Sequence, residues 1–418
     1  MKLNNYTIKI KYKEGYILYS LISKTLIFVD SDFFINSTNK IDYNIDKNQL
    51  EYLNNHFIIS EDDSKDYENF IKIVYDFNSQ NDIGRFMIHL GYDCNLDCSY
   101  CYQANIKNNI KRNTSNIINT ISNIIKKENF SELDICFIGG EPLLYLDSLL
   151  KISDFISLNS KIDKIHYSVV TNGTFLNNND VLIELKNHNI KEFQITIDGI
   201  KKDHDKFRNK NNNGSFDLII NNLKYLQEKH KDIDVLLNCN ISKYNFNNVH
   251  KIIDFLKSRN IRYPVFFSLI FDSNQSQNNS IKYSGDIWYS IHKYAINNGY
   301  KYLPFYRDMY LGCAITQKNY YTINPNGEIY SCINGIEDKK YFISSNSNSV
   351  EKIQNIKLKN LETKIESLSL RCKKCQLLPI CFGGCDYRNE INGFECNKNF
   401  ILNNEISIIK EIVNARSL

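Results

Sequence analysis

Three cysteines stand close together in the stretch CNLDCSYCY, residues 94–102. Cys94, Cys98 and Cys101 have the spacing C-x3-C-x2-C and follow an alternating apolar run at 85–90, which predicts a strand. Three thiolates on one loop can converge on a metal centre. Tetrahedral zinc takes four ligands, whereas a four-iron cluster can accept three cysteines and leave one iron open. The triplet therefore favours an iron–sulfur cluster, with a zinc knuckle or a redox cysteine group as the alternative.

The elements that must position this triplet alternate regularly along the chain. Strands are predicted at 85–91, 134–139, 165–171, 192–198, 234–241 and 264–270, and helices at 113–128, 143–158, 178–189, 215–231, 247–260 and 284–299. Such repeats form a parallel sheet with right-handed crossovers, and active sites lie at the carboxyl ends of its strands. We therefore predict an α/β fold, a partial (β/α)6 barrel, because a full barrel needs two more units.

Glycine-rich and polar motifs follow the next three predicted strands. GGEP at 139–142 comes after the second, TNGT at 171–174 after the third, and TIDG at 196–199 with HDKFR at 204–208 after the fourth. Glycine allows close approach of the backbone to a ligand, and proline fixes the following turn. We expect these motifs to meet the cysteine triplet at one edge of the sheet.

Together, the triplet and these motifs resemble the radical S-adenosylmethionine (SAM) enzymes that modify peptides and proteins. In that family the open iron chelates SAM, and an electron from the cluster releases a 5′-deoxyadenosyl radical. By this resemblance, Glu141 is expected at the SAM ammonium and Thr196 at its carboxylate. The residues expected to bind SAM are Gly139, Gly140, Glu141, Pro142, Asn172, Thr196, Asp198 and Arg208. For the last three, a strand-end cap or a surface salt bridge is the alternative.

The other nine cysteines divide into two groups. Cys136 and Cys239 fall within predicted strands, and we expect them in the core as small apolar residues. The remaining seven resemble the SPASM domain, which holds two auxiliary four-iron clusters, with two zinc ions as the alternative. By that resemblance the distal cluster is held by Cys372, Cys375, Cys381 and Cys396, and the proximal cluster by Cys313, Cys332 and Cys385. One proximal iron then lacks a cysteine and is open to a substrate thiolate or closed by another ligand.

Residues 1–84 contain no cysteine. Strands are predicted at 6–12, 16–20 and 25–29 and helices at 47–57 and 64–77, a small α+β domain. Radical SAM peptide maturases often carry a leader-binding domain of this kind, whose edge strand pairs with an incoming peptide. A plain cap over the barrel is the alternative. The predicted domains are therefore 1–84, a radical SAM barrel at 85–305 and a SPASM domain at 306–418.

Composition narrows the partners and the compartment. The 418 residues are 42% hydrophobic and 23% charged with a net charge of +4, which favours neither nucleic acid nor a membrane. The start of the chain is polar and has no signal-peptide pattern, so we expect a cytoplasmic protein. Twelve cysteines in such a protein indicate metal binding rather than disulfides.

Three classes of function compete. The preferred one is maturation of a ribosomal precursor peptide by three 4Fe-4S clusters and SAM, forming a thioether or other crosslink, with reduced flavodoxin or ferredoxin as electron donor. The second is anaerobic sulfatase maturation, in which relatives place an Asp directly after the cysteine of G-x4-C. Here that position is Ile333, which cannot accept a proton. The third is a non-enzymatic iron–sulfur electron-transfer protein.

Overall fold

The computed structural model describes residues 1–34, 40–41, 45–104, 106, 111–270, 285–300, 313–345, 350–393, 396 and 398–416. The chain divides into two compact units. The first unit comprises Met1–Asn81, Tyr306–Cys313 and Lys359–Leu418, and the second comprises Asp82–Phe305 and Ala314–Leu358. The three domain ranges expected from the sequence stay predictions, and the expected boundary at 305 lies outside the described residues.

One nine-stranded sheet forms the centre of the second unit, in the order β13-β12-β9-β8-β7-β6-β14-β15-β16. Its strands are β6 (Ile83–His89), β7 (Glu132–Ile138), β8 (Lys164–Thr171), β9 (Glu192–Thr196), β12 (Asp234–Ile241), β13 (Val265–Leu269), β14 (Tyr320–Ile323), β15 (Ile329–Tyr330) and β16 (Phe342–Ser344). All neighbours from β13 to β14 are parallel, and the last two pairs are antiparallel. The α/β prediction is therefore confirmed, with β14 as a further parallel strand beside β6.

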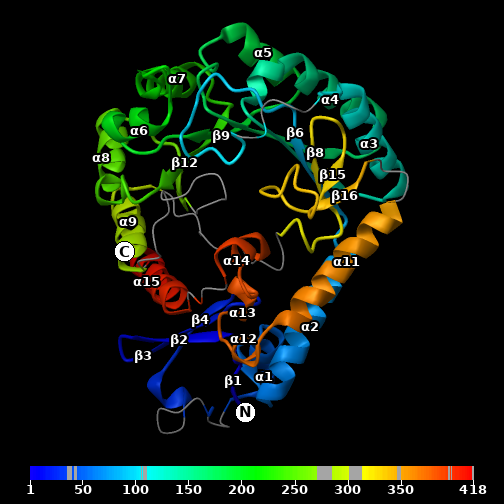
Figure 1. The fold of residues 1–418 in the computed structure, drawn as a ribbon. Helices are drawn as coiled ribbons and strands as arrows, with labels where there is room; N and C mark the ends of the chain where they lie inside the picture. Colours follow the sequence, from blue (N-terminus) through cyan, green and yellow to red (C-terminus); the bar gives the residue numbers. More distant parts are fainter. Residues whose placement is uncertain are drawn as a thin grey trace. The chain divides into compact units, whose positions relative to one another are not determined.

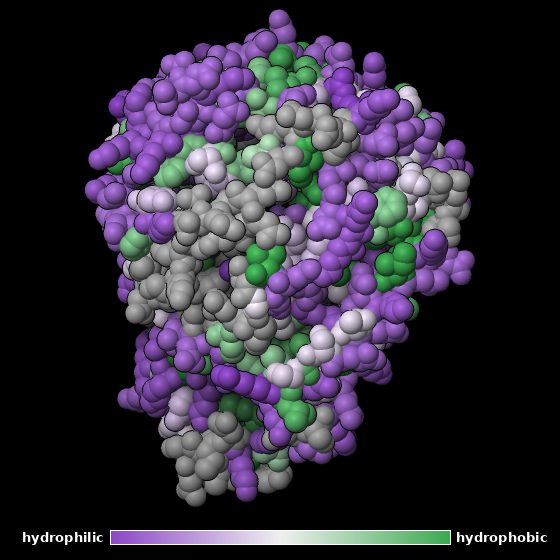
Figure 2. Space-filling model, viewed as in Figure 1, coloured by the Kyte–Doolittle hydropathy of each residue, from purple (hydrophilic) through white to green (hydrophobic). Residues whose placement is uncertain are grey.

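Helices follow the strands along the outer side of the sheet (Figure 1). They are α3 (Thr114–Lys127), α4 (Leu146–Asn159), α5 (Asn179–Asn187), α6 (Lys201–Phe207), α7 (Phe216–Lys229), α8 (His250–Ser258) and α9 (Gly285–Asn297), with short 3-10 turns η3 (Pro142–Tyr145) and η4 (Phe246–Asn248). In α3, Ile117, Ile121 and Ile124 recur at helical spacing and are fully buried, and Asn113 caps the first turn. On the face that is seen in Figure 2, the coloured residues are mostly hydrophilic. None of the helices in the described ranges has the length and apolar character needed to span a membrane.

Alternation along the strands explains the two strand cysteines. In β7, Ile135 and Phe137 are fully buried, while Cys136 between them points to the opposite face and is only partly buried. In β12, Cys239 shares a buried face with Leu237 and has no exposed surface. The core prediction thus holds fully for Cys239 and only in part for Cys136.

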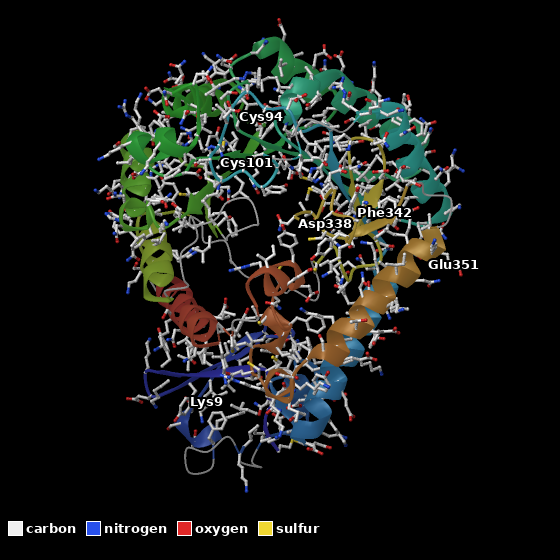
Figure 3. All side chains as sticks on the ribbon, in the orientation of Figure 1. Lys9, Cys94, Cys101, Asp338, Phe342 and Glu351 are labelled. Carbon is white, nitrogen blue, oxygen red and sulfur yellow. The ribbon has the colours of Figure 1, made fainter. Side chains whose placement is uncertain are left out.

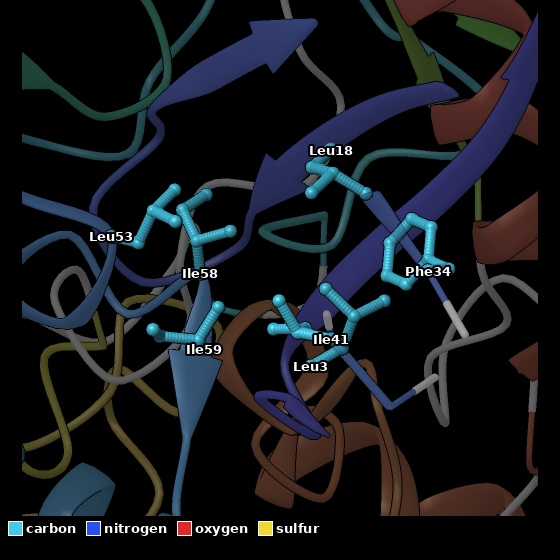
Figure 4. Close-up of a cluster of buried hydrophobic side chains, with 7 residues drawn as sticks. All are labelled: Leu3, Leu18, Phe34, Ile41, Leu53, Ile58 and Ile59. Carbon is cyan, nitrogen blue, oxygen red and sulfur yellow. The ribbon is translucent and has the colours of Figure 1, made fainter. Parts of the chain in front are cut away.

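The first unit begins with a small sheet. Strands β2 (Thr7–Tyr12), β3 (Gly15–Ser20) and β4 (Leu26–Val29) are antiparallel in that order, so the predicted hairpin is confirmed. The other elements are the β1 (Lys2–Leu3) and β5 (Ile59–Ser60) pair, η1 (Ser31–Phe33), α1 (Lys47–Asn55) and α2 (Asp63–Gln80). An apolar cluster lies under this sheet and is formed by Leu3, Leu18, Phe34, Ile41, Leu53, Ile58 and Ile59 (Figure 4).

The C-terminal segment of the chain packs in the same unit. Its helices are α12 (Leu370–Lys373), α13 (Leu378–Cys381), α14 (Asp386–Asn392) and α15 (Lys398–Arg416). The rings of Phe70 in α2 and Phe382 after α13 lie 6.1 Å apart, edge to face. The Gln376 side chain donates to the carbonyl of Thr7 at 2.7 Å. The N-terminal sheet and the C-terminal cysteine helices therefore share one packed body.

Helix α11 (Val350–Ser367) contains the division between the units, between Leu358 and Lys359. Two lysines in it are buried on either side of that division. Lys357 donates to backbone carbonyls of the second unit, and Lys364 donates to the Gly384 carbonyl at 2.8 Å in the first. A charged amine is buried at little cost only where such acceptors surround it.

Candidate active site

The cysteine loop follows β6 and is held on one side by the turn after β7. The Gly140 amide donates to the Gly91 carbonyl and the Glu141 amide to the Asp93 carbonyl, both at 2.9 Å. A Cβ atom at Gly140 would lie 2.1 Å from the Asp93 oxygen, and one at Gly139, where φ is +144°, would lie 2.3 Å from the Gly91 oxygen. The two glycines therefore let the chain's own backbone approach, where the sequence had suggested approach to a ligand.

The other side of the cysteine loop is held by the segment after α6. The Asp97 amide donates to the Asn209 carbonyl at 2.8 Å, and the Ser99 amide donates to the Phe207 carbonyl at 3.1 Å. Asp97 directly precedes Cys98 and Ser99 directly follows it, so these bonds fix the backbone on both sides of the middle cysteine. The HDKFR motif thus supports the loop through its main chain, a role that the sequence pattern did not indicate.

Cys94 and Cys101, labelled in Figure 3, lie on this loop together with Cys98, and all three are partly buried. Burial raises the pKa of the Cys98 thiol to about 11, the Arg208 guanidinium lowers it, and the two neighbouring thiols raise it further. Within the described residues, no three His, Cys, Asp or Glu side chains are grouped to hold a single metal ion. A four-iron cluster binds each thiolate to a different iron, so this donor set fits such a cluster without converging on one ion.

Glu141 has no exposed surface, and its carboxylate joins the turn after β7 to the end of β8. One oxygen accepts from the Thr171 hydroxyl at 2.7 Å and from the Leu143 amide at 3.1 Å, and the other accepts from the Asn172 amide at 2.8 Å. Burial raises the pKa of this carboxyl, and the three hydrogen bonds act in the opposite direction. Glu141 is therefore a brace inside the site, and its contact with the SAM ammonium stays a prediction. Pro142 is buried at the start of η3 and fixes that turn.

Asp198 and Arg208 meet at the Tyr100 side chain. The Tyr100 hydroxyl donates to the Asp198 carboxylate, and the Arg208 guanidinium donates to the Tyr100 oxygen at 2.8 Å. The second Asp198 oxygen accepts from the Asn240 amide at 2.9 Å. The Arg208 Nε is buried and has no hydrogen-bond partner in the described part of the chain. A buried guanidinium with a free donor fits an anionic ligand such as the SAM carboxylate.

His204 positions Arg208 through a chain of hydrogen bonds. The Asp198 amide lies 3.2 Å from His204 Nδ1, and Nε2 lies 3.0 Å from the Ser215 hydroxyl, which donates to the Arg208 carbonyl at 2.9 Å. Burial keeps the pKa of this imidazole well below its usual value, so the ring is neutral with Nε2 protonated. Thr196, at the end of β9, is buried and lies opposite Asn238 of β12 in the sheet register.

The TNGT motif after β8 lies directly against the cysteine loop. The side-chain nitrogen of Asn172 lies 2.7 Å from the side-chain oxygen of Asn95 and 3.8 Å from the Cys94 sulfur. Asn95 in turn donates to the Thr174 hydroxyl at 2.8 Å. The predicted Asn172 is therefore brought to the site, together with Asn95, which sequence reasoning did not single out.

The C-terminal cysteines are placed in different ways. The expected distal set lies entirely in the first unit, where the Cys375 and Cys381 thiols interact electrostatically with Cys372, and Cys375 also with Cys396. Burial raises the pKa of Cys381 to about 11. The expected proximal set draws on both units, with Cys332 in the second unit and Cys313 and Cys385 in the first. The distal donors thus lie near one another in one unit, and their role as cluster ligands stays a prediction.

Comparisons with known proteins agree with this geometry. The family model of the radical SAM superfamily matches residues 88–263, the part of the chain that carries the cysteine loop and the strand-end motifs. These residues form a radical SAM domain, and the sheet that contains them has an α/β fold.

Two curated proteins show the range of this chain's relatives. The cysteine-type anaerobic sulfatase-maturating enzyme of Clostridium novyi (strain NT) is 27% identical over 342 residues, 72% of this chain and 87% of the relative. The radical SAM cyclopropyl synthase TigE of Paramaledivibacter caminithermalis is 30% identical over 186 residues, 40% of this chain and 38% of the relative.

Two solved structures have a similar fold. That of anSMEcpe with bound AdoMet and the Kp18Cys peptide has a TM-score of 0.65 at 18% identity, covering 80% of this chain and 100% of that one. Streptococcus suis SuiB bound to the precursor peptide SuiA has a TM-score of 0.54 at 18% identity, covering 94% of this chain and 97% of SuiB.

Proposed function

We propose that this protein is a radical SAM maturase that modifies a peptide or a protein segment. One observation carries the proposal: the three-cysteine loop is clamped between the GGEP turn and the segment that holds Arg208, at the carboxyl ends of parallel strands. Ligands bind at this edge in such sheets. The similarity to enzymes that mature sulfatases and to a peptide-bound SuiB supports a polypeptide substrate.

The positions of the site residues suggest a role for each of them. Cys94, Cys98 and Cys101 would hold the SAM-cleaving cluster, and Arg208 with its free Nε would receive the SAM carboxylate. When bound, the clusters and SAM supply a 5′-deoxyadenosyl radical that removes a hydrogen atom from the substrate, and an acceptor for the remaining electron. The chain's own contribution is to hold the loop, keep Arg208 aimed through His204, and exclude water by burial.

Our preferred reaction is formation of a thioether or another crosslink in a ribosomal precursor peptide. Overall, such a substrate loses two hydrogen atoms, one from carbon and one from the thiol. The fold similarity to SuiB extends over 94% of the chain, against 80% for anSMEcpe, so SuiB also matches segments that anSMEcpe does not. Strand β4 is an edge of its sheet in the described residues, and it carries Phe28 with 59% of its surface exposed. An incoming peptide strand could pair there.

Formylglycine formation is the second candidate, because the relative that aligns over 342 residues is a sulfatase-maturating enzyme. Against it stands Ile333, at the position where that resemblance expects a proton-accepting Asp. The two reactions give different products. A crosslink keeps the sulfur and removes two hydrogens, whereas formylglycine formation from cysteine removes the sulfur and leaves an aldehyde.

The test uses the anaerobically reconstituted full chain. We expect three four-iron clusters, about twelve irons, and slow cleavage of SAM to 5′-deoxyadenosine after reduction. Glu141→Ala should weaken SAM binding while keeping the iron, and Cys239→Ala, a buried thiol outside the expected ligand sets, should match the wild type in both. Mass spectrometry of short cysteine-rich peptides encoded beside this gene, and of a sulfatase peptide, separates the two reactions. Zinc as the stoichiometric metal would overturn the proposal.

A further inference from the structure

Asn172 lies close enough to the Cys94 sulfur to donate a hydrogen bond to it. The amide nitrogen is 3.8 Å from Sγ, a normal N–H···S distance for the larger sulfur atom. A backbone donor, the Leu96 amide, lies 3.4 Å from the same sulfur. Cys94 therefore has one fixed main-chain donor and one side-chain donor, and the side-chain donor comes from a different strand end.

The orientation of the Asn172 amide is determined by its neighbours. Its oxygen accepts from the Thr174 amide at 2.9 Å and from the Thr174 hydroxyl at 2.7 Å. Because the Thr174 backbone amide can only donate, the Asn172 oxygen must face it, and the NH2 group points the other way, toward Asn95 and Cys94. An amide NH2 has two hydrogens, and here one meets the Asn95 oxygen at 2.7 Å and the other meets the sulfur. The donor is thus locked in place.

Hydrogen bonds to the backbone of the turn at 172–173 fix the position of the Asn172 side chain. The backbone amide of Asn172 donates to the Glu141 carboxylate at 2.8 Å. The next residue, Gly173, has a φ of +81°, a conformation that residues with a side chain rarely adopt. Asn222 of α7 donates to the Gly173 carbonyl at 2.7 Å. Asn172 itself is 5% exposed, so its side-chain donor is largely shielded from water.

We propose that Asn172 raises the reduction potential of the cluster at Cys94, Cys98 and Cys101 by this hydrogen bond to the Cys94 sulfur. The inference rests on the proposed function, because it assumes that cluster. A hydrogen bond to a cluster thiolate favours the reduced, more negative state, and outer-shell donors tune metal centres in this way. Burial strengthens the effect, since the local dielectric is low. Asn172 is a positioning and tuning residue, and it does not need to touch the substrate.

The experiment is an EPR-monitored redox titration of the reconstituted full chain without SAM. The relevant signal is identified as the one that changes when SAM is added. For Asn172→Leu we expect full iron content and about tenfold less reduced cluster at a fixed potential, which is a shift of about 59 mV to more negative values for one electron. Exchange into deuterated buffer should also give a deuterium coupling at this cluster in the wild type that is weaker in the variant.

Asn222→Leu is the matched control, because it removes a buried amide that braces the same turn without touching sulfur. Its potential should equal that of the wild type. Asn172→Ala removes the same donor without adding a charge, so it serves where the leucine variant folds poorly. An unchanged potential in an iron-loaded Asn172 variant, or an equal shift in Asn222→Leu, overturns the inference. Absence of any cluster in the wild type would instead overturn the proposed function.

Discussion

Replacing Phe70 with alanine should destabilise the first unit at both ends of the chain. Phe70 has no exposed surface, and its ring lies 5.3 Å from that of Tyr6 and 6.1 Å from that of Phe382. The first partner belongs to the N-terminal segment and the second follows Cys381 directly. The side chain therefore joins the N-terminal sheet to the expected distal cluster site.

The magnitude follows from burial. A buried Phe→Ala replacement costs about 3–5 kcal/mol, because it removes transfer free energy and leaves a cavity. For a unit of this size that corresponds to a fall in melting temperature of roughly 10 °C. Domains have only about 5–15 kcal/mol of stability, so the loss is a large fraction of the total.

Two measurements check this prediction in the reconstituted full chain. Thermal unfolding followed by circular dichroism should show an earlier transition, and mild chelation should remove about a third of the iron, the share of one of the three expected clusters. SAM cleavage by the second unit should persist. Phe28→Ala, a replacement at a 59% exposed ring in the same unit, is the control and should unfold like the wild type. The packing argument is refuted if Phe70→Ala and Phe28→Ala have the same melting temperature. It is also refuted if the rate of SAM cleavage falls in proportion to the loss of iron.

Three further predictions concern the second unit. Gly140→Ala should displace the cysteine loop, because the new Cβ would lie 2.1 Å from a backbone oxygen; reconstituted iron should fall by about a third, and unchanged iron content would contradict it. Replacing all three cysteines of the 94–101 loop with alanine should remove about a third of the iron and all SAM cleavage, measured as 5′-deoxyadenosine. Thr171→Val should cost about 1.5–3 kcal/mol in urea unfolding, because it takes a donor from a buried carboxylate, and a loss below about 0.5 kcal/mol would argue against that bond.

The order of strands and helices in the second unit was predictable because its apolar periodicity is strong. The strand expected at 234–241 is β12 (Asp234–Ile241), and the helix expected at 178–189 contains α5 (Asn179–Asn187). Helix α6 was missed because its residues are mostly charged and show no apolar stripe. The pairing of β14 with β6 joins segments far apart in the sequence, and local patterns carry no signal for such a pairing.

Spacing alone indicated a metal centre at Cys94, whereas Arg208 was expected at the site only from the family resemblance, and the roles of both stay predictions. Tyr100 and His204 were not assigned their contacts, because a polar side chain finds its partner only after the strand ends come together. The glycines of GGEP were assigned to ligand approach, but the sequence does not show that their Cα atoms face the backbone at Asp93. The sequence indicated that glycine is needed at these positions, but it did not show which part of the chain lies against them.

Helix α11 has a consequence for exchanging segments between relatives. Leu361 and Lys364 lie three residues apart in its part of the first unit, where Leu361 is fully buried and Lys364 donates to the Gly384 carbonyl. A helix turns about 100° with each residue, so one residue inserted or deleted between them would swing the lysine away from that carbonyl while Leu361 stays in the core. Surface loops tolerate such length changes, but this turn of the helix does not. A chimera that exchanges the segment after α11 must therefore keep the spacing between Leu361 and Lys364, while the side chains on the exposed face of the helix are free to differ.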